Sequence, residues 1–265
     1  MMKKYEVPFN FAYDFESKLL RKQELFPYIS CIYLPAYKED AATTRYGIWQ
    51  QEEYPKSYDE YLFRLKALMQ LGIPICVLMQ RGATLETRER YYDLGIRIFT
   101  MNDDALAVAM KERHKDVELT LSVTRALTEQ ELKTKDLSMY DRIVLFYWFS
   151  RHLDAVKALP KKYRYILMPN CECYWNCRWH DLHWFAGSPE DERKATDLCH
   201  QCVKELHDTA FIEPENLSYF DPYVDSYKLL DRLFSTDRIL SELSRFAYRN
   251  VGAEKRKEDY FNVDA

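Results

Sequence analysis

Short apolar runs alternate with amphipathic segments along most of the chain. The apolar runs are rich in Ile, Val, Leu and Tyr, and each is only a few residues long, as is typical of buried strands. The segments between them repeat apolar residues at helical spacing. Strands are therefore expected at residues 5–9, 29–34, 73–79, 96–100, 117–123, 142–147, 165–168 and 224–230.

Helix-end signals accompany the amphipathic segments. Ser57 precedes one such segment as a predicted N-cap, and Gly72 marks its end. Asn102 and Ser235 are expected to cap later helices in the same way. The expected helices cover residues 15–24, 58–71, 84–94, 103–110, 128–135, 150–159 and 238–250.

Strand-then-helix units repeat eight times in a chain of 265 residues. This order favours an α/β fold, a (β/α)8 TIM-like barrel that need not be regular. We expect residues 1–252 to form this single domain and residues 253–265 to form a charged, mobile C-terminal tail. A doubly wound open sheet is the alternative, but its dinucleotide-binding form needs a Gly-rich first turn, and none follows Phe9.

In either architecture, ligands bind where the carboxyl ends of the strands meet. The loop at residues 35–54 leaves one of these ends and is unusually long, which is more typical of functional loops than of plain connections. The candidate residues at the strand ends are Asn10, Tyr33, Gln80, Arg81, Thr100, Thr124, Arg125, Tyr147, Asn170, Asp231 and Arg232.

Cysteine and histidine concentrate in an insertion at residues 169–213, after the seventh strand. Cys173 and Cys177 are four positions apart, and Cys199 and Cys202 are three apart. Two closely spaced pairs can converge on one metal centre, because zinc and iron–sulfur clusters prefer thiolate ligands. These four residues are the predicted ligands, with Cys171 as an alternate, while disulfides or simple packing are the competing interpretations.

The sequence shows no apolar signal segment and no stretch long enough to span a membrane. We therefore expect a cytoplasmic location, where thiols stay reduced and a cluster of them more often binds metal. The net charge of −4 does not indicate a broad nucleic-acid-binding surface, although a local basic groove stays open.

The insertion and the last strand resemble a known family. The sequences NCECYWNCRWHDLHWF and CHQC, and the later segment from residue 211 to residue 232, are similar to short members of the collagenase-like peptidase group called U-thirty-two. The matching positions in that segment are Ile212, Pro214, Glu215, Leu217, Tyr219, Asp225, Lys228, Leu229 and Arg232. One departure is Cys177-Arg178-Trp179-His180, where the family pattern has C-P-x-R.

The resemblance implies a barrel-like fold that carries a 4Fe–4S cluster on four cysteines. It also implies a role in oxygen-independent hydroxylation of RNA bases or of quinone precursors, with prephenate as the oxygen donor. Some proteins of this kind work as heteromeric pairs, so a protein partner is a further expectation. Classical peptidase activity is not expected, because the chain contains no G-x-S-x-G or H-E-x-x-H motif.

Two functions from different classes follow. The first is a 4Fe–4S-dependent, hydroxylase-type enzyme that holds a small anion, such as a prephenate-like carboxylate, with basic and polar groups at the strand ends. Its substrate-binding candidates are Arg45, Asn170, His183, Lys228 and Arg232. The second is a non-catalytic binding protein in which zinc or a cluster only staples the insertion.

Overall fold

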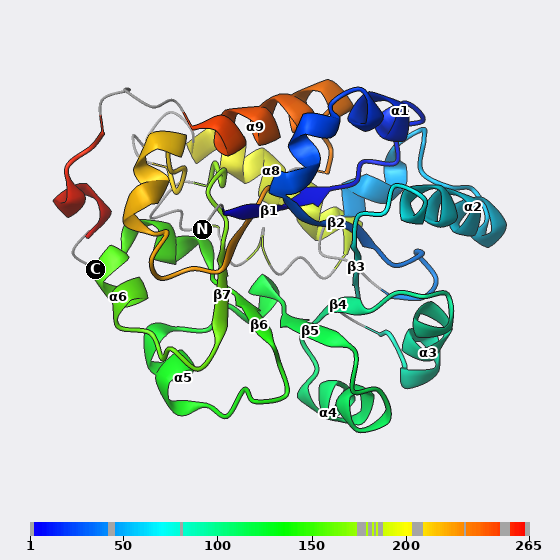
Figure 1. The fold of residues 1–265 in the computed structure, drawn as a ribbon, viewed down its shortest axis with the longest axis horizontal. Coiled ribbons are helices and arrows are strands. Elements are labelled where there is room, and N and C mark those ends of the chain that lie inside the picture. Colours follow the sequence, from blue (N-terminus) through cyan, green and yellow to red (C-terminus); the bar gives the residue numbers. More distant parts are fainter. Residues whose placement is uncertain are drawn as a thin grey trace.

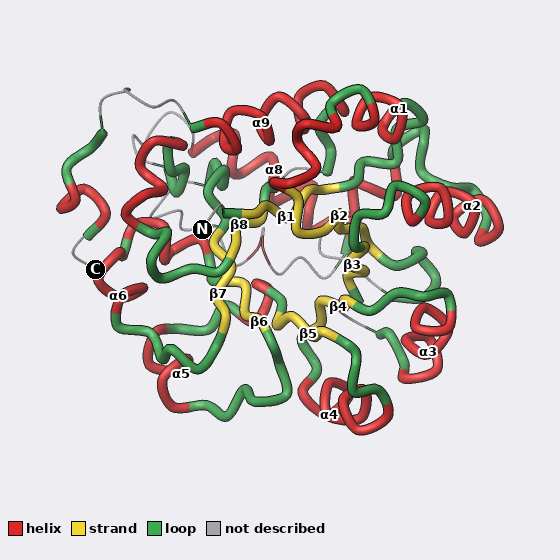
Figure 2. The backbone as a smooth tube through the Cα atoms, in the orientation of Figure 1, coloured by secondary structure: helices red, strands yellow, loops and turns green. Residues whose placement is uncertain are grey.

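The predicted strands pair in chain order into one closed, parallel barrel (Figures 1 and 2). The computed structural model describes residues 3–41, 46–79, 82–173, 179, 182, 184, 188–202, 209–230, 232–249 and 255–262. The strands are β1 (Lys4–Pro8), β2 (Ile29–Pro35), β3 (Ile75–Leu78), β4 (Ile98–Met101), β5 (Glu118–Leu121), β6 (Arg142–Val144), β7 (Arg164–Leu167) and β8 (Ser226–Lys228). The (β/α)8 prediction is confirmed, and the open sheet is excluded because β1 also pairs with β8.

Helices surround the barrel and mostly begin where the sequence predicts. The α-helices are α1 (Phe15–Leu20), α2 (Tyr58–Met69), α3 (Leu85–Asp93), α4 (Asp104–Arg113), α5 (Glu129–Thr134), α6 (Leu153–Lys157), α8 (Pro189–Cys202) and α9 (Thr236–Tyr248). The 3₁₀ helices are η1 (Gln23–Tyr28), η2 (Tyr46–Gln50), η3 (Val123–Arg125), η4 (Tyr147–Arg151), η5 (Pro214–Tyr219) and η6 (Glu258–Phe261).

The predicted N-caps are correct with one exception. Ser57 accepts a hydrogen bond from the backbone N–H of Glu60 in α2, and Ser235 caps α9. The prediction for Asn102 is wrong, because Asp103 accepts the bond from the N–H of Leu106 at 3.0 Å. The side-chain amide of Asn102 instead donates a hydrogen bond to the hydroxyl of Thr124, which follows the end of β5.

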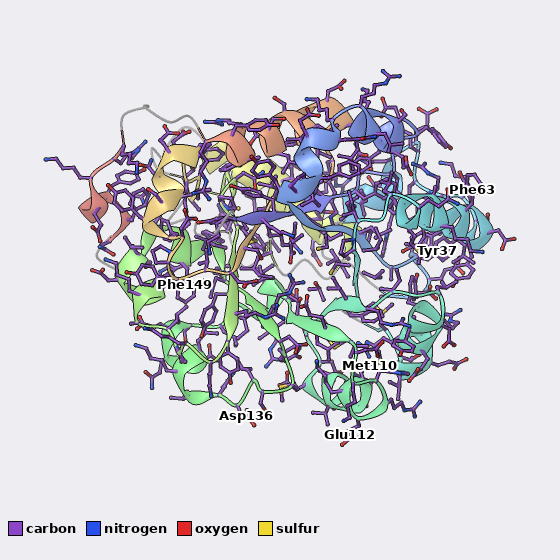
Figure 3. The ribbon with its side chains drawn as sticks, in the orientation of Figure 1. Tyr37, Phe63, Met110, Glu112, Asp136 and Phe149 are labelled. Atoms are coloured by element: carbon purple, nitrogen blue, oxygen red, sulfur yellow. The ribbon has the colours of Figure 1, made fainter. Side chains whose placement is uncertain are left out.

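Strand side chains alternate between two environments. On β2, Ile32 and Leu34 pack outward against the helices, whereas Cys31 and Tyr33 point into the barrel. The helices show the matching pattern: Met110 of α4 is buried toward the barrel, and Glu112 is exposed on the opposite side (Figure 3). Apolar contacts therefore hold the helices against the barrel, and the inward-facing strand positions can carry polar side chains.

The insertion at residues 169–213 is closed at its base and contains α8, which sequence patterns did not predict. The N–H groups of Ala210 and Ile212 donate to the carbonyls of Cys173 and Pro169, each at 2.8 Å. Helix α8 then packs on η2 of the long β2–α2 loop and crosses behind β1 in the view of Figure 1. The two long loops thus meet at the same end of the barrel, which we call the mouth.

The expectation of a mobile tail is wrong for residues 255–262. Phe261 in η6 is only 1% exposed and packs against Tyr219 and Phe220. The side chain of Asn262 accepts a hydrogen bond from the N–H of Asp154 at 2.8 Å, in the first turn of α6. The tail therefore covers the outside of the barrel between η4 and η5.

Among the described residues, none of the helices combines the length and the apolar character that a membrane span requires.

Candidate functional site

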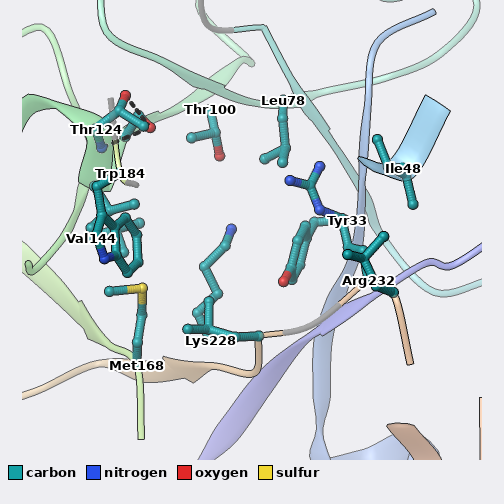
Figure 4. Close-up of a pocket in the computed structure, with 14 residues that line it drawn as sticks. Tyr33, Ile48, Leu78, Thr100, Thr124, Val144, Met168, Trp184, Lys228 and Arg232 are labelled. Atoms are coloured by element: carbon teal, nitrogen blue, oxygen red, sulfur yellow. Dashed lines mark hydrogen bonds between the residues drawn. The ribbon is translucent and has the colours of Figure 1, made fainter. Parts of the chain in front are cut away.

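A cavity of about 90 Å³ opens at the mouth of the barrel (Figure 4). At about 30 Å³ per molecule in the liquid, this volume corresponds to roughly three water molecules. The cavity is formed by residues from strand ends, the β2–α2 loop, the insertion and the loop after β8. The lining residues are Tyr33, Ile48, Leu78, Thr100, Ser122, Val123, Thr124, Val144, Met168, Trp184, Lys228, Leu230, Arg232 and Leu233.

The cavity floor follows from the register of the barrel. Inward residues of even-numbered strands form one layer there, as in other (β/α)8 barrels, where alternate strands fill successive layers. This floor layer consists of Tyr33, Thr100, Val144 and Lys228. The layer beneath it comes from odd-numbered strands and consists of Glu6, Cys76, Thr120 and Ile166.

Lys228 is the charged group of the floor. Its Nζ lies 2.9 Å from Oε2 of Glu6 and 3.8 Å from the ring centroid of Tyr33. The Tyr33 hydroxyl donates to the carbonyl of Leu229 at 2.6 Å, which fixes this ring beside the amine. In Figure 4 the amine of Lys228 points into the space between Trp184 on one side and Tyr33 on the other. It is thus placed to contact a ligand in the cavity.

Beneath the floor, ion pairs continue through the barrel. Glu6 is fully buried and lies 3.0 Å from Nη1 of Arg142, whose Nε lies 2.9 Å from Glu118. Glu118 in turn pairs with Arg164 at 2.7 Å, and this arginine is half-exposed at the opposite end. Burial alone would raise the pKa of Glu6, but Lys228 and Arg142 outweigh it and lower this pKa below its ordinary value. Glu6 is therefore an anion that keeps Lys228 in place.

The cavity walls divide into a polar and an apolar side. Thr100, Ser122 and Thr124 present hydroxyl groups, and the Thr124 hydroxyl donates to Oγ of Ser122 at 3.0 Å. Met168 and Trp184 form the apolar side. A compact ligand with an anionic end and an apolar body matches this combination of groups.

Two predicted strand-end residues have different roles. Arg232 lines the cavity, as predicted for a residue after the last strand. Asn170 is buried, and its Oδ1 accepts a hydrogen bond from the N–H of Leu230 at 2.8 Å. Asn170 therefore ties the end of β7 to the loop after β8. Asn10 also bridges two segments, because its side-chain amide donates a hydrogen bond to the backbone carbonyl of Phe234 at 2.9 Å.

The thiols of the insertion are described only in part. The indole N–H of Trp184 donates to Sγ of Cys173 at 3.3 Å. Cys171 is 1% exposed and packs with Val144, Ile166 and Met168 as a small apolar residue. Cys199 and Cys202 lie in the last turn of α8, where a spacing of three places them on one helix face.

Several predicted site residues lie outside the described residues. These are Arg45, Gln80, Arg81, Cys177, His183 and Asp231. The side chains of Cys199 and Cys202 are also outside the description. Within the described residues no cluster of Cys, His, Asp and Glu forms a metal site. The four-cysteine ligand set therefore stays a prediction.

Sequence reasoning missed the groups beneath the floor. Glu6 and Arg142 occur in strands whose other residues are mostly apolar, and both were passed over as ordinary strand residues. The available signal was periodicity, because a charged residue at an inward position of a barrel strand must find a partner inside. Ile48 was also missed, since only the folded β2–α2 loop brings it to the cavity.

Comparison with known proteins supports the fold alone. No protein-family model matches this sequence, and no curated protein matches it. The solved structure of the U32 peptidase Mk0906 is similar with a TM-score of 0.51 at 12% identity, covering 87% of this chain and 93% of that one.

Two further solved structures are similar at lower scores. A GH113 β-1,4-mannanase has a TM-score of 0.48 at 10% identity, covering 94% of this chain and 100% of that one. A conserved protein of unknown function from Enterococcus faecalis has a TM-score of 0.46 at 13% identity, covering 93% and 66%. At such identities, what is shown is a (β/α)8 barrel similar to that of a U32 peptidase.

Proposed function

We propose that this protein is an enzyme of the U32-like group whose mouth cavity binds a compact substrate through an anionic group. The observation that carries the proposal is the ammonium of Lys228, which is buried in the floor of the cavity and points into it. A cation held at the base of a largely apolar pocket is suited to orient a carboxylate or a phosphate.

The charges around Lys228 support an anionic ligand. Lys228, Arg142 and Arg164 carry three positive charges, against two negative charges on Glu6 and Glu118, so the connected chain is positive by one. Arg232 also lines the cavity wall. The ion pairs beneath the floor thus favour an anion over a neutral or cationic molecule.

The thiol loop supports a 4Fe–4S cluster beside this cavity, with Cys173, Cys177, Cys199 and Cys202 as ligands. Two features fit: Cys173 accepts an N–H···S hydrogen bond, as cluster sulfurs do, and Cys199 and Cys202 share a helix face. The packing of Cys171 among apolar side chains favours Cys173 as the ligand. When bound, the cluster would supply electron transfer for oxygen-independent hydroxylation. The protein's own residues would hold the substrate and exclude water.

Under this proposal the anion is a prephenate-like carboxylate, and the modified molecule is RNA or a small aromatic compound. A heteromeric protein partner and a cytoplasmic location remain predictions from the sequence. In favour of the small carboxylate, the Trp184 and Met168 side of the cavity offers an apolar surface to its ring.

The proposal is tested by calorimetric titration of prephenate into the wild-type protein and three variants. Lys228→Met should weaken binding by tenfold or more, which corresponds to about 1.4 kcal/mol or more. Arg232→Gln should weaken it less, because this residue lies on the wall. Lys255→Met, a change of an exposed lysine in the tail, serves as the control and should bind like the wild type. Equal affinity in Lys228→Met and the control would refute the role of Lys228.

The alternative function is a structural staple without catalysis, and one observation bears on it. Backbone hydrogen bonds from Ala210 and Ile212 already close the base of the insertion, so a metal is not needed for that closure. Because the insertion closes without metal, a metal centre at the mouth is favoured as a functional site over a structural staple. One tightly held zinc per chain, with no prephenate binding, would favour the staple instead.

A further inference from the structure

Several polar atoms in the barrel interior make no hydrogen bond. Within the described part of the chain, Oγ1 of Thr120, Oγ of Ser226 and Nη2 of Arg142 are buried and accept or donate none. Nε of Arg142 and Oε1 of Glu6 make none either, but each lies within 3.0 Å of an oppositely charged atom. The exposed fractions of Thr120, Ser226 and Arg142 are 0%, 3% and 4%, so bulk solvent does not reach them. Buried polar groups in folded proteins nearly always have a partner, which is either protein or ordered water.

The three atoms belong to residues at inward positions of the barrel. Thr120 alternates with Leu119 and Leu121, which pack outward, so its own side chain points into the barrel. Arg142 is the register partner of Thr120 on the next strand, and its guanidinium reaches across the interior to Glu6 on β1. Ser226 lies two residues before Lys228 on β8, between β7 and β1, so its side chain also points into the barrel.

The charge of Arg142 decides what can bind there. Its Nη1 and Nε already face the carboxylates of Glu6 and Glu118 at 3.0 and 2.9 Å. An additional anion would therefore lie beside two carboxylates that already face this guanidinium, and a cation would be repelled by Arg142 itself. A neutral molecule that both donates and accepts hydrogen bonds satisfies all three atoms, and water is the smallest such molecule.

We propose that the barrel interior beneath the cavity floor contains a buried water site, formed by Arg142 Nη2, Thr120 Oγ1 and Ser226 Oγ. The water fixes the guanidinium of Arg142 across the barrel, Arg142 fixes Glu6, and Glu6 holds Lys228 at the cavity floor. Thr120 and Ser226 are thus positioning residues for the floor, although they do not line the cavity.

Oxygen-17 relaxation dispersion, which detects long-lived internal waters, tests the proposal together with thermal unfolding. Thr120→Val and Ser226→Ala remove one hydroxyl each with little change in volume. Each variant should lose the signal of roughly one long-lived water and should unfold at a lower temperature, because the remaining partners are left unsatisfied. Thr236→Val is the control, since the Thr236 hydroxyl donates to Asp14 and its removal affects stability without touching the barrel interior.

The control should unfold at a lower temperature with an unchanged relaxation signal. An unchanged signal in both Thr120→Val and Ser226→Ala would overturn the proposal, whatever their unfolding temperatures. A rise in unfolding temperature in these variants would show in addition that no water binds to the Thr120 and Ser226 hydroxyls. Neither readout depends on prephenate or on a metal, so failure of the proposed function would leave the result interpretable.

Discussion

Glu6 connects the cavity to the interior of the barrel. It is fully buried and faces two cations, Lys228 and Arg142. Glu6→Gln keeps the shape of the side chain but leaves both cations without their carboxylate. We expect a loss of about 3–5 kcal/mol in the free energy of unfolding, measured by urea titration, because the substitution leaves buried cations without a compensating charge.

A matched change of a surface pair is the control for Glu6→Gln. Glu129 forms an i, i+4 pair with Lys133 at the surface of α5, and Glu129→Gln should cost about 0.5 kcal/mol or less. Equal effects of the two substitutions would show that the interior ion pairs do not support the fold.

His152 should make stability depend on pH. The residue is buried against Trp148, with ring centroids 3.5 Å apart, and burial followed by the nearby charge of Arg151 lowers its pKa from 6.5 to about 4. The unfolded chain therefore binds the proton first as the pH falls. Stability should be fully present above about pH 6.5 and should decline toward pH 4, by roughly 1–2 kcal/mol.

The check for His152 is a series of urea titrations over this pH range. The wild type should lose stability between about pH 6.5 and pH 4, and His152→Gln should show a flatter profile in that window. Parallel profiles for the two proteins would mean that another group controls the decline.

At the residue scale, sequence reasoning identified the groups at the strand ends better than those inside the barrel. Lys228 and Arg232 are substrate-binding candidates from the sequence, and both line the cavity at the mouth; their binding role stays a prediction. Asn170 reaches the same region but satisfies a backbone N–H of the loop after β8. Hydrogen-bond partners of this kind depend on how close two loops come, and sequence spacing does not contain that information.

The C-terminal tail is the element that departs most from expectation. Two of its residues have structural roles that its charged composition does not indicate. Phe261 is buried in the core, and Asn262 accepts a hydrogen bond from the first turn of α6. Truncation after residue 252 should cost about 3–5 kcal/mol for the lost aromatic packing and about 1 kcal/mol for the lost cap. Thermal unfolding of the truncated chain measures this loss.

Single substitutions separate the two parts of this prediction. Phe261→Ala should reproduce most of the destabilisation, and Asn262→Ala should reproduce only the smaller part. A truncated chain as stable as the full-length protein would contradict a structural role for the tail and favour the expectation of a mobile one.

Helix α8 shows a second limit of sequence patterns at the scale of elements. Its sequence, PEDERKATDLCHQC, contains few apolar residues, and α8 packs on η2 at the mouth. A narrow contact needs few apolar residues, so the segment lacks the apolar content that marks a helix in the sequence. Glu192 of this helix instead accepts a hydrogen bond from the N–H of Gly47 at 2.9 Å.

At the scale of the whole molecule, the barrel was predictable because every strand repeats the same physical requirement. Each strand has an outward apolar face, is followed by a helix or loop, and lies beside the preceding strand. The cavity was predictable in position but not in shape, because Ile48 and Trp184 reach it from long loops. The chemistry at the mouth therefore depends mainly on the two long loops, whose conformation the strand pattern does not predict.

The most direct test of the proposed enzyme is an ultraviolet–visible spectrum of anaerobically purified protein, with iron, sulfide and zinc analysis of the same sample. The account predicts a broad absorption near roughly 400 nm and about four iron and four sulfide per chain, both lost in Cys173→Ala. A colourless protein with about one zinc per chain would contradict it and would make the thiol loop a structural site.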